Sequence, residues 1–242
     1  MNFSALFWDW ALILLGLLII VPWRGKVRIR QLLSGPELAA RQRMRLYGTT
    51  IVFQWLLTAI VFWRAFARHL GLDELGLAWG DPSRTIGIAV GITLLLCANQ
   101  VLGLHKAAQV PEEHRGFLFK FTHRIMPRSL AEKLTFTGLA ATAGICEEFL
   151  YRGFVFAVFV RFFAEARSPV WAAALLSSIW FAIGHIYQGQ RGLITTFIVG
   201  MIFVSMRIWS HSLFPPMLAH ALIDLVAGIY ASKLFSSKDL PA

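Results

Sequence analysis

Three ionisable side chains lie close together in an otherwise apolar run, at Glu147, Glu148 and Arg152. A charged side chain at the centre of a membrane helix costs about 2.5 to 3.5 kcal/mol on insertion scales, so each of these groups needs a partner. Glu148 and Arg152 are one helical turn apart and can form an ion pair on one face of a helix. Glu147 points about 100° away from Glu148, which predicts a partner for it on another helix.

Two later apolar runs carry polar side chains that could be those partners. Phe181 and His185 are four residues apart, and so are His220 and Asp224, which follow a helix-starting pair of prolines. Polar side chains at membrane depth face the interior of a bundle or a water-filled cavity, where they pair with one another. We therefore expect a single site formed by Glu147, Glu148, Arg152, His185, His220 and Asp224.

A carboxylate and two imidazoles in a wet pocket suit the activation of water for hydrolysis. Glu147, buried and without the ion pair available to Glu148, could act as the general base, with His185 holding the same water. His220, oriented by Asp224, could stabilise the oxyanion of a tetrahedral intermediate. Glu147, His185 and His220 are also a plausible ligand set for a zinc ion (Zn2+) with one position open for water.

Other hydrolase patterns are absent from the sequence. It contains neither the HExxH motif of soluble zinc proteases nor a Gly-x-Ser-x-Gly nucleophile elbow. Ser177 and Ser178 lie two turns before His185 and are interpreted as packing residues. Cys97 and Cys146 both fall in apolar runs, which predicts neither a disulfide framework nor a thiolate metal cluster.

The composition indicates the elements that must position this site. Of 242 residues, 57% are hydrophobic and 15% are charged, which is typical of a polytopic membrane protein. Apolar runs of spanning length predict an all-α bundle of about seven transmembrane helices. We place these helices at residues 5–23, 47–66, 84–104, 134–160, 169–188, 192–209 and 212–234.

The basic residues predict how the chain lies in the membrane. Segments 24–46 and 105–133 are long and basic, so the positive-inside rule places them in the cytoplasm, with the N-terminus outside and the C-terminus inside. Membrane topology and anionic lipid head groups explain the net charge of +10, and no nucleic-acid partner is expected. Residues 112–133 interleave charges with aromatics and could be an amphipathic surface helix or a solvated loop.

The three motifs Glu-Glu-x-x-x-Arg, Phe-x-x-x-His and His-x-x-x-Asp, in this order, resemble those of the CPBP family. This family contains the type II CAAX prenyl endopeptidases and bacterial relatives described as abortive-infection or bacteriocin-immunity proteins. The resemblance covers about residues 134–232, which we predict to be an intramembrane protease domain. Residues 1–133 would supply N-terminal helices and basic loops, and residues 233–242 a C-terminal tail.

The resemblance implies cleavage of peptide bonds at a membrane-enclosed site, classically after a prenylated cysteine. Glu147 and His185 would activate the water, while His220 and residue 224 would lie on the oxyanion side. The positions with structural roles would be Glu148, Arg152 and Phe181. The family is often labelled metalloprotease, although a metal-free glutamate mechanism is also argued for it. Zn2+ is therefore left open.

One position departs from the family. Asparagine is commoner where this chain has Asp224, and an ionised aspartate cannot donate a hydrogen bond to an oxyanion. Asp224 could orient His220, bind a metal, or be protonated; we favour the first.

Two further functions compete with the protease. A catalytically silent scaffold or bacteriocin-immunity-type protein would use the same polar cluster to hold its helices together. A small transporter is disfavoured, because no internal repeat is visible. As a protease, the protein would act in a bacterial plasma membrane, with the lipid bilayer and a membrane-embedded or lipidated peptide as its partners.

Overall fold

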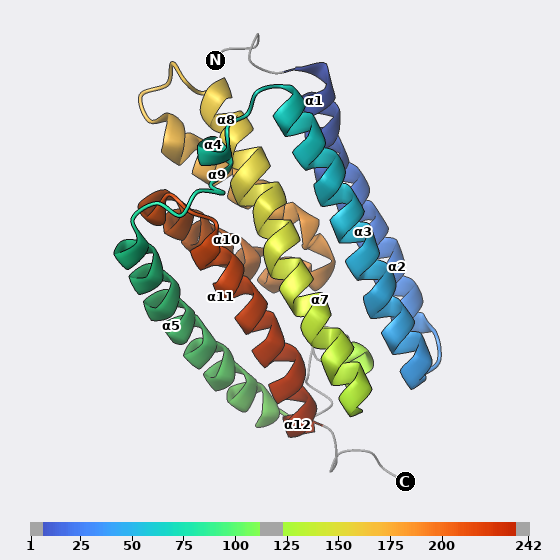
Figure 1. Ribbon diagram of the computed structural model, residues 1–242. Helices are drawn as coiled ribbons and strands as arrows, with labels where there is room; N and C mark the ends of the chain where they lie inside the picture. Colours follow the sequence, from blue (N-terminus) through green and yellow to red (C-terminus); the bar gives the residue numbers. More distant parts are fainter. Residues whose placement is uncertain (1–6, 112–122, 236–242) are drawn as a thin grey trace.

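The chain forms an elongated bundle of helices in a computed structural model that describes residues 7–111 and 123–235 (Figure 1). Within these residues every regular element is a helix; η2, η4 and η6 are π-helical and η5 is 3-10. In chain order the elements are α1 (Trp8–Leu15), η2 (Gly16–Ile20), α2 (Val21–Ser34), α3 (Ala40–Ala67), α4 (Leu72–Leu75), α5 (Pro82–Ala108), α7 (Leu130–Glu148), η4 (Phe149–Val155), α8 (Phe156–Phe162), α9 (Pro169–Gly184), η5 (Ile186–Gln188), α10 (Gly189–Ser210), α11 (Phe214–Leu225), η6 (Val226–Tyr230) and α12 (Ala231–Phe235).

The first long helix extends well past its apolar part. α1, η2 and α2 follow one another without a break, so the loop predicted at 24–46 is wrong and only residues 35–39 separate α2 from α3. The basic residues of α2 are compatible with a helix because Arg and Lys have high helix propensity and long side chains that reach water. Of the segment 112–133, residues 112–122 lie outside the described part, and α7 begins at Leu130.

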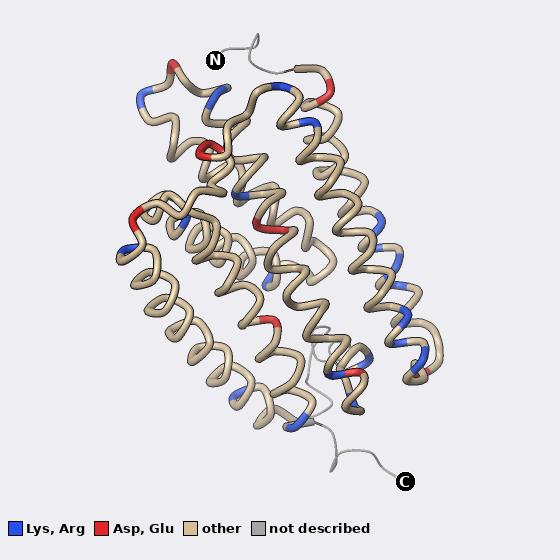
Figure 2. Tube along the Cα trace, viewed as in Figure 1, with Lys and Arg blue, Asp and Glu red and all other residues tan. Residues whose placement is uncertain are grey.

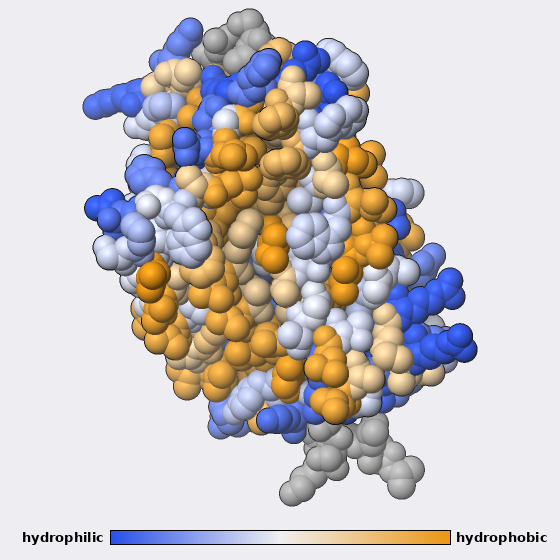
Figure 3. Space-filling view, viewed as in Figure 1, coloured by the Kyte–Doolittle hydropathy of each residue, from blue (hydrophilic) through white to orange (hydrophobic). Residues whose placement is uncertain are grey.

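The protein is an integral membrane protein of the all-α class, as predicted. In the described ranges five helices are long and apolar enough to cross a membrane, and α7 and the 16-residue α9 are not among them. The count of seven therefore stays a prediction. An apolar surface covers the middle of the bundle, and hydrophilic residues gather at its ends (Figure 3). The five spans are Trp8–Ser34, Ala40–Ala67, Pro82–Ala108, Ile186–Ser210 and Phe214–Leu234.

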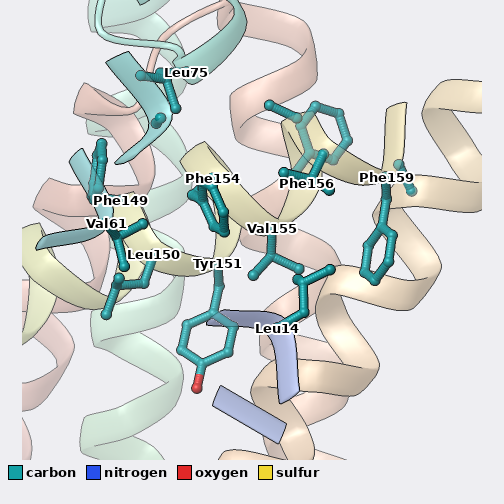
Figure 4. Packing of buried hydrophobic residues seen from close by; sticks show 14 of the residues in the cluster. Leu14, Val61, Leu75, Phe149, Leu150, Tyr151, Phe154, Val155, Phe156 and Phe159 are labelled. Carbon is teal, nitrogen blue, oxygen red and sulfur yellow. The ribbon is translucent and has the colours of Figure 1, made fainter. Parts of the chain in front are cut away.

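α7 lies at the centre of the bundle and packs against α3 on one side and α11 on the other (Figure 1). It begins with a capping box in which the Ser129 hydroxyl accepts a hydrogen bond from the Glu132 N–H. It continues without a break into η4 and α8, where the side chains of Phe154, Val155 and Phe156 enter the largest apolar core (Figure 4). The first motif thus lies on the most enclosed helix of the fold.

Gly144 sets the distance between α7 and α11. A Cβ at this position would lie 2.7 Å from the Met217 carbonyl oxygen and 2.8 Å from the Ala221 Cβ, so the two backbones nearly touch. Small residues allow this close approach in membrane helices. The contact places the end of α7 beside the middle of α11. Figure 2 shows acidic residues within the bundle, at the end of α7 and near the end of α11, whereas Lys and Arg gather along α2 and at the start of α3.

Candidate active site

The first motif contains a buried ion pair. Arg152 Nη1 donates to Glu148 Oε1 at 2.9 Å, and both side chains are fully buried. The same carboxylate oxygen accepts a 2.7 Å hydrogen bond from His220 Nδ1 on α11. The i,i+4 pair predicted from the sequence is therefore present, and it extends to a third group on another helix.

Aromatic rings also contact the guanidinium of Arg152. Its Cζ lies 4.0 Å from the centroid of Phe181 and 5.4 Å from that of Phe203. Gly200 leaves space for it, since a Cβ there would lie 3.2 Å from Nη2. Within the described part of the chain, Arg152 Nε and Nη2 and the second oxygen of Glu148 have no hydrogen-bond partner. Phe181, assigned a structural role by the resemblance, also contacts the rings of His185 and His220.

Two carboxylates lie close to the ring of His220. Glu148 forms the short hydrogen bond to the ring, whereas Asp224 Oδ2 lies 3.7 Å from Nε2, too far for a hydrogen bond. The buried Glu148 reaches across from α7 and holds the ring at Nδ1, and the orienting role expected of Asp224 stays a prediction. The side chain of Asp224 is 42% exposed and not in a dry pocket.

Glu147 faces a cavity. Its side chain is 19% exposed, as is that of His185. Its Oε1 accepts a 2.7 Å hydrogen bond from Gln54 Nε2 on α3, and its Oε2 lies 3.8 Å from His185 Nε2. Glu147 therefore finds partners on two other parts of the bundle, and each of its oxygens has a different neighbour.

The hydrogen bond at Nδ1 decides the tautomer of His185. Nδ1 lies 2.9 Å from the carbonyl oxygen of Phe181, which can only accept, so Nδ1 carries the proton. In the neutral ring Nε2 is then an acceptor that faces a second acceptor, Glu147 Oε2. Their 3.8 Å separation is too long for a direct hydrogen bond, but one water molecule can donate to both atoms.

These groups line one cavity of about 440 Å³ between α2, α3, α7 and α11. Besides Glu147, His185, His220 and Asp224, the lining includes Tyr151 and two arginines of α2. Arg24 lies 4.5 Å from the ring centroid of Phe53, and Arg28 donates to the Thr49 hydroxyl at 2.8 Å. Among residues 7–111 and 123–235 neither arginine forms an ion pair with a carboxylate. The cavity therefore has an acidic, histidine-containing end and a basic end.

Sequence reasoning missed the contribution of α2 and α3. Gln54 looked like one polar residue in the apolar run 47–66, and Arg24 and Arg28 were assigned to a loop. A glutamine inside a spanning run was the available signal for Gln54. Its partner could not be identified, because no spacing rule connects residues that lie 93 positions apart.

The predicted zinc ligands do not form a ligand set as they are arranged. Among the described residues there is no group of three or more His, Cys, Asp or Glu side chains that could hold a metal ion. His220 Nδ1 is occupied by Glu148, and Glu147 Oε1 is occupied by Gln54. The zinc site therefore stays a prediction.

Comparison with known families gives a match for the part of the chain that carries the three motifs. Residues 129–226 match the family model described as Type II CAAX prenyl endopeptidase Rce1-like, and all three motifs lie in this segment. The family resemblance drawn from the motifs is thus confirmed over these residues. No curated protein and no solved structure matches the chain. The chain is an integral membrane protein, and its residues 129–226 are similar to this endopeptidase family.

Proposed function

We propose that the chain is an intramembrane endopeptidase that hydrolyses peptide bonds of membrane-embedded or lipidated, CAAX-type substrates. The observation that carries this proposal is the pair of acceptor atoms, Glu147 Oε2 and His185 Nε2, that face each other 3.8 Å apart at a cavity. A cluster that served only to hold helices together would be closed, as Glu148 and Arg152 are. Glu147 and His185 are instead accessible.

In the first step a water molecule donates one hydrogen bond to Glu147 and one to His185. Glu147 Oε2 takes a proton as the water oxygen forms a bond to the carbonyl carbon of the substrate. The carbonyl oxygen becomes an oxyanion in the tetrahedral intermediate. This route needs the ionised carboxylate and the neutral imidazole, and in the neutral ring the hydrogen bond from Nδ1 to Phe181 leaves Nε2 as the acceptor.

In the second step the carbon–nitrogen bond breaks and the amine leaves. Glu147 returns its proton to the leaving nitrogen, so that the products are a carboxylic acid and an amine. His220 would face the oxyanion, because Glu148 holds Nδ1 and directs Nε2 to the cavity. As an imidazolium, His220 would donate its Nε2–H to the developing charge, a role that the ionised Asp224 cannot take.

The basic end of the cavity suits a peptide that ends in a free carboxylate, as CAAX-type substrates do. Arg24 and Arg28 lie one turn apart, and a substrate carboxylate between them would form charge-assisted hydrogen bonds. The scissile bond would then lie beside Glu147. In this proposal the basic ends of α2 and α3 face the cytoplasm of a bacterium, with the N-terminus outside and the C-terminus inside.

Cleavage of a peptide library in liposomes tests the function. Glu147→Ala and His185→Ala should each abolish cleavage while the protein still inserts and folds. Glu147→Gln keeps the contact geometry but removes the base, so it should also be inactive. A Glu147→Gln protein that cleaves normally would rule out the general-base role and favour the silent scaffold.

A further inference from the structure

Gln54 makes the shortest contact to the proposed base, although it lies outside the segment that matches the family. It is on α3, and its Nε2 is 2.7 Å from Glu147 Oε1. A carboxylate only accepts hydrogen bonds, so the amide must present its NH2 group to Glu147. Its own carbonyl oxygen, Oε1, is buried and has no hydrogen-bond partner in the described chain.

This hydrogen bond fixes the rotation of the carboxylate. The terminal torsion of glutamate is broad and roughly two-fold, so an unrestrained carboxylate would sample many orientations. With Oε1 bound to Gln54, Oε2 is the oxygen that faces His185 Nε2. Gln54 therefore decides which oxygen can take the proton of a water held by His185.

The neutral amide suits this task better than a cation would. Lysine or arginine at position 54 would pair with Glu147 and neutralise the charge that a base needs. Glutamine donates one hydrogen bond and leaves the carboxylate anionic. The unpaired Gln54 carbonyl costs free energy, which a residue kept only for helix packing would have no reason to carry.

We propose that Gln54 is a positioning residue for Glu147, which it holds with Oε2 directed at the water shared with His185. The inference rests on the proposed hydrolytic function and adds a part of the machinery supplied by α3. Gln54 acts through Glu147 and does not itself contact the reacting atoms.

Several other titratable or charged groups surround the Glu147 carboxylate. A substitution of Gln54 leaves all of them unchanged, so a change in the pH profile reports the change at position 54. They are Cys146 on α7, Glu148 at the end of α7, Tyr151 and Arg152 on η4, His185 after α9, Tyr187 on η5, and His220 and Asp224 on α11.

The test compares Gln54→Leu and Gln54→Glu with a matched control. Trp55 Nε1 donates to the Thr142 hydroxyl at 3.2 Å and also joins α3 to α7, so Thr142→Val removes a comparable contact away from Glu147. The probe is a fluorescence-quenched peptide with a farnesylated cysteine, in liposomes. The readouts are kcat, KM and the dependence of kcat/KM on pH. The acid limb of this dependence is the fall in kcat/KM as the pH decreases.

Gln54→Leu should lower kcat by about 10- to 100-fold with KM nearly unchanged. Its acid limb should move to higher pH by about 0.5 to 1 unit, because the ionised carboxylate loses a donor. Gln54→Glu should move the limb further, by more than about 1 unit, since two carboxylates then share a proton. Thr142→Val should leave the limb in place.

An unchanged kcat and acid limb in both Gln54 variants would overturn the inference, as would the same changes in Thr142→Val. If Gln54→Leu does not fold, Gln54→Glu, which has the same size, decides the question. An active Glu147→Ala protein would refute the proposed function itself. Inactive Glu147 variants together with normal Gln54 variants would refute only the role of Gln54.

Discussion

Glu148 and His220 are joined across α7 and α11 by a 2.7 Å hydrogen bond from Nδ1 to Oε1. The same oxygen binds Arg152, so one buried carboxylate both neutralises a buried guanidinium and sets the direction of an imidazole. Two neighbouring glutamates thus have separate environments. Glu148 is enclosed in an ion pair with Arg152, and Glu147 is accessible at the cavity.

Glu148→Gln should destabilise the protein strongly. It leaves the guanidinium of Arg152 buried without a counter-charge, a change that costs about 3 to 5 kcal/mol. Adding Arg152→Met removes that charge and should recover much of the folded protein. The measurements are the thermal unfolding temperature and the monodisperse fraction in detergent. Equal stability of Glu148→Gln and wild type would show that the ion pair is dispensable.

Gly144→Ala should separate α7 from α11 and reduce both stability and cleavage, because a new Cβ would meet the backbone of α11 at 2.7 to 2.8 Å. Gly138→Ala is the matched control on the same helix. Its Cβ would lie 3.8 Å from Ile51 Cδ1, an ordinary contact, and alanine favours the helix by about 1 kcal/mol. Unfolding temperatures should fall for Gly144→Ala and hold or rise for Gly138→Ala; the reverse order would contradict the close contact.

Arg28→Gln should raise KM by about tenfold for a peptide with a free C-terminal carboxylate, because a charge-assisted hydrogen bond is lost. The same peptide with a C-terminal amide should bind wild type and variant about equally. Arg30→Gln removes an equal charge from an exposed position of α2 that does not line the cavity, and it should have little effect. Equal losses for acid and amide peptides would argue against carboxylate recognition.

Treatment with a chelator should leave cleavage within about twofold of the untreated rate, because the route through Glu147 and His185 uses no metal ligand set. The assay compares dialysed protein with and without chelator, and then after addition of Zn2+. Loss of activity that Zn2+ restores would establish the alternative, in which Glu147, His185 and His220 rearrange into metal ligands.

Local spacing was enough to predict part of the site. The one-turn separations of Glu148 and Arg152, and of His220 and Asp224, follow from the geometry of a helix. The cost of charge in lipid also requires polar residues on different helices to meet. The partner of each group could not be predicted in this way. Glu148 forms the short hydrogen bond to His220, because Gly144 lets α7 approach α11 closely enough.

The sequence by itself determined the class of protein, an all-α membrane bundle, and the three motifs of an endopeptidase family, because apolar length and turn spacing are local properties. Tertiary structure decided which glutamate is enclosed and which faces the cavity. It also brought Gln54 of α3 and the arginines of α2 to the site. These contacts depend on how the helices pack, and packing is set by the shapes of surfaces far apart in the chain.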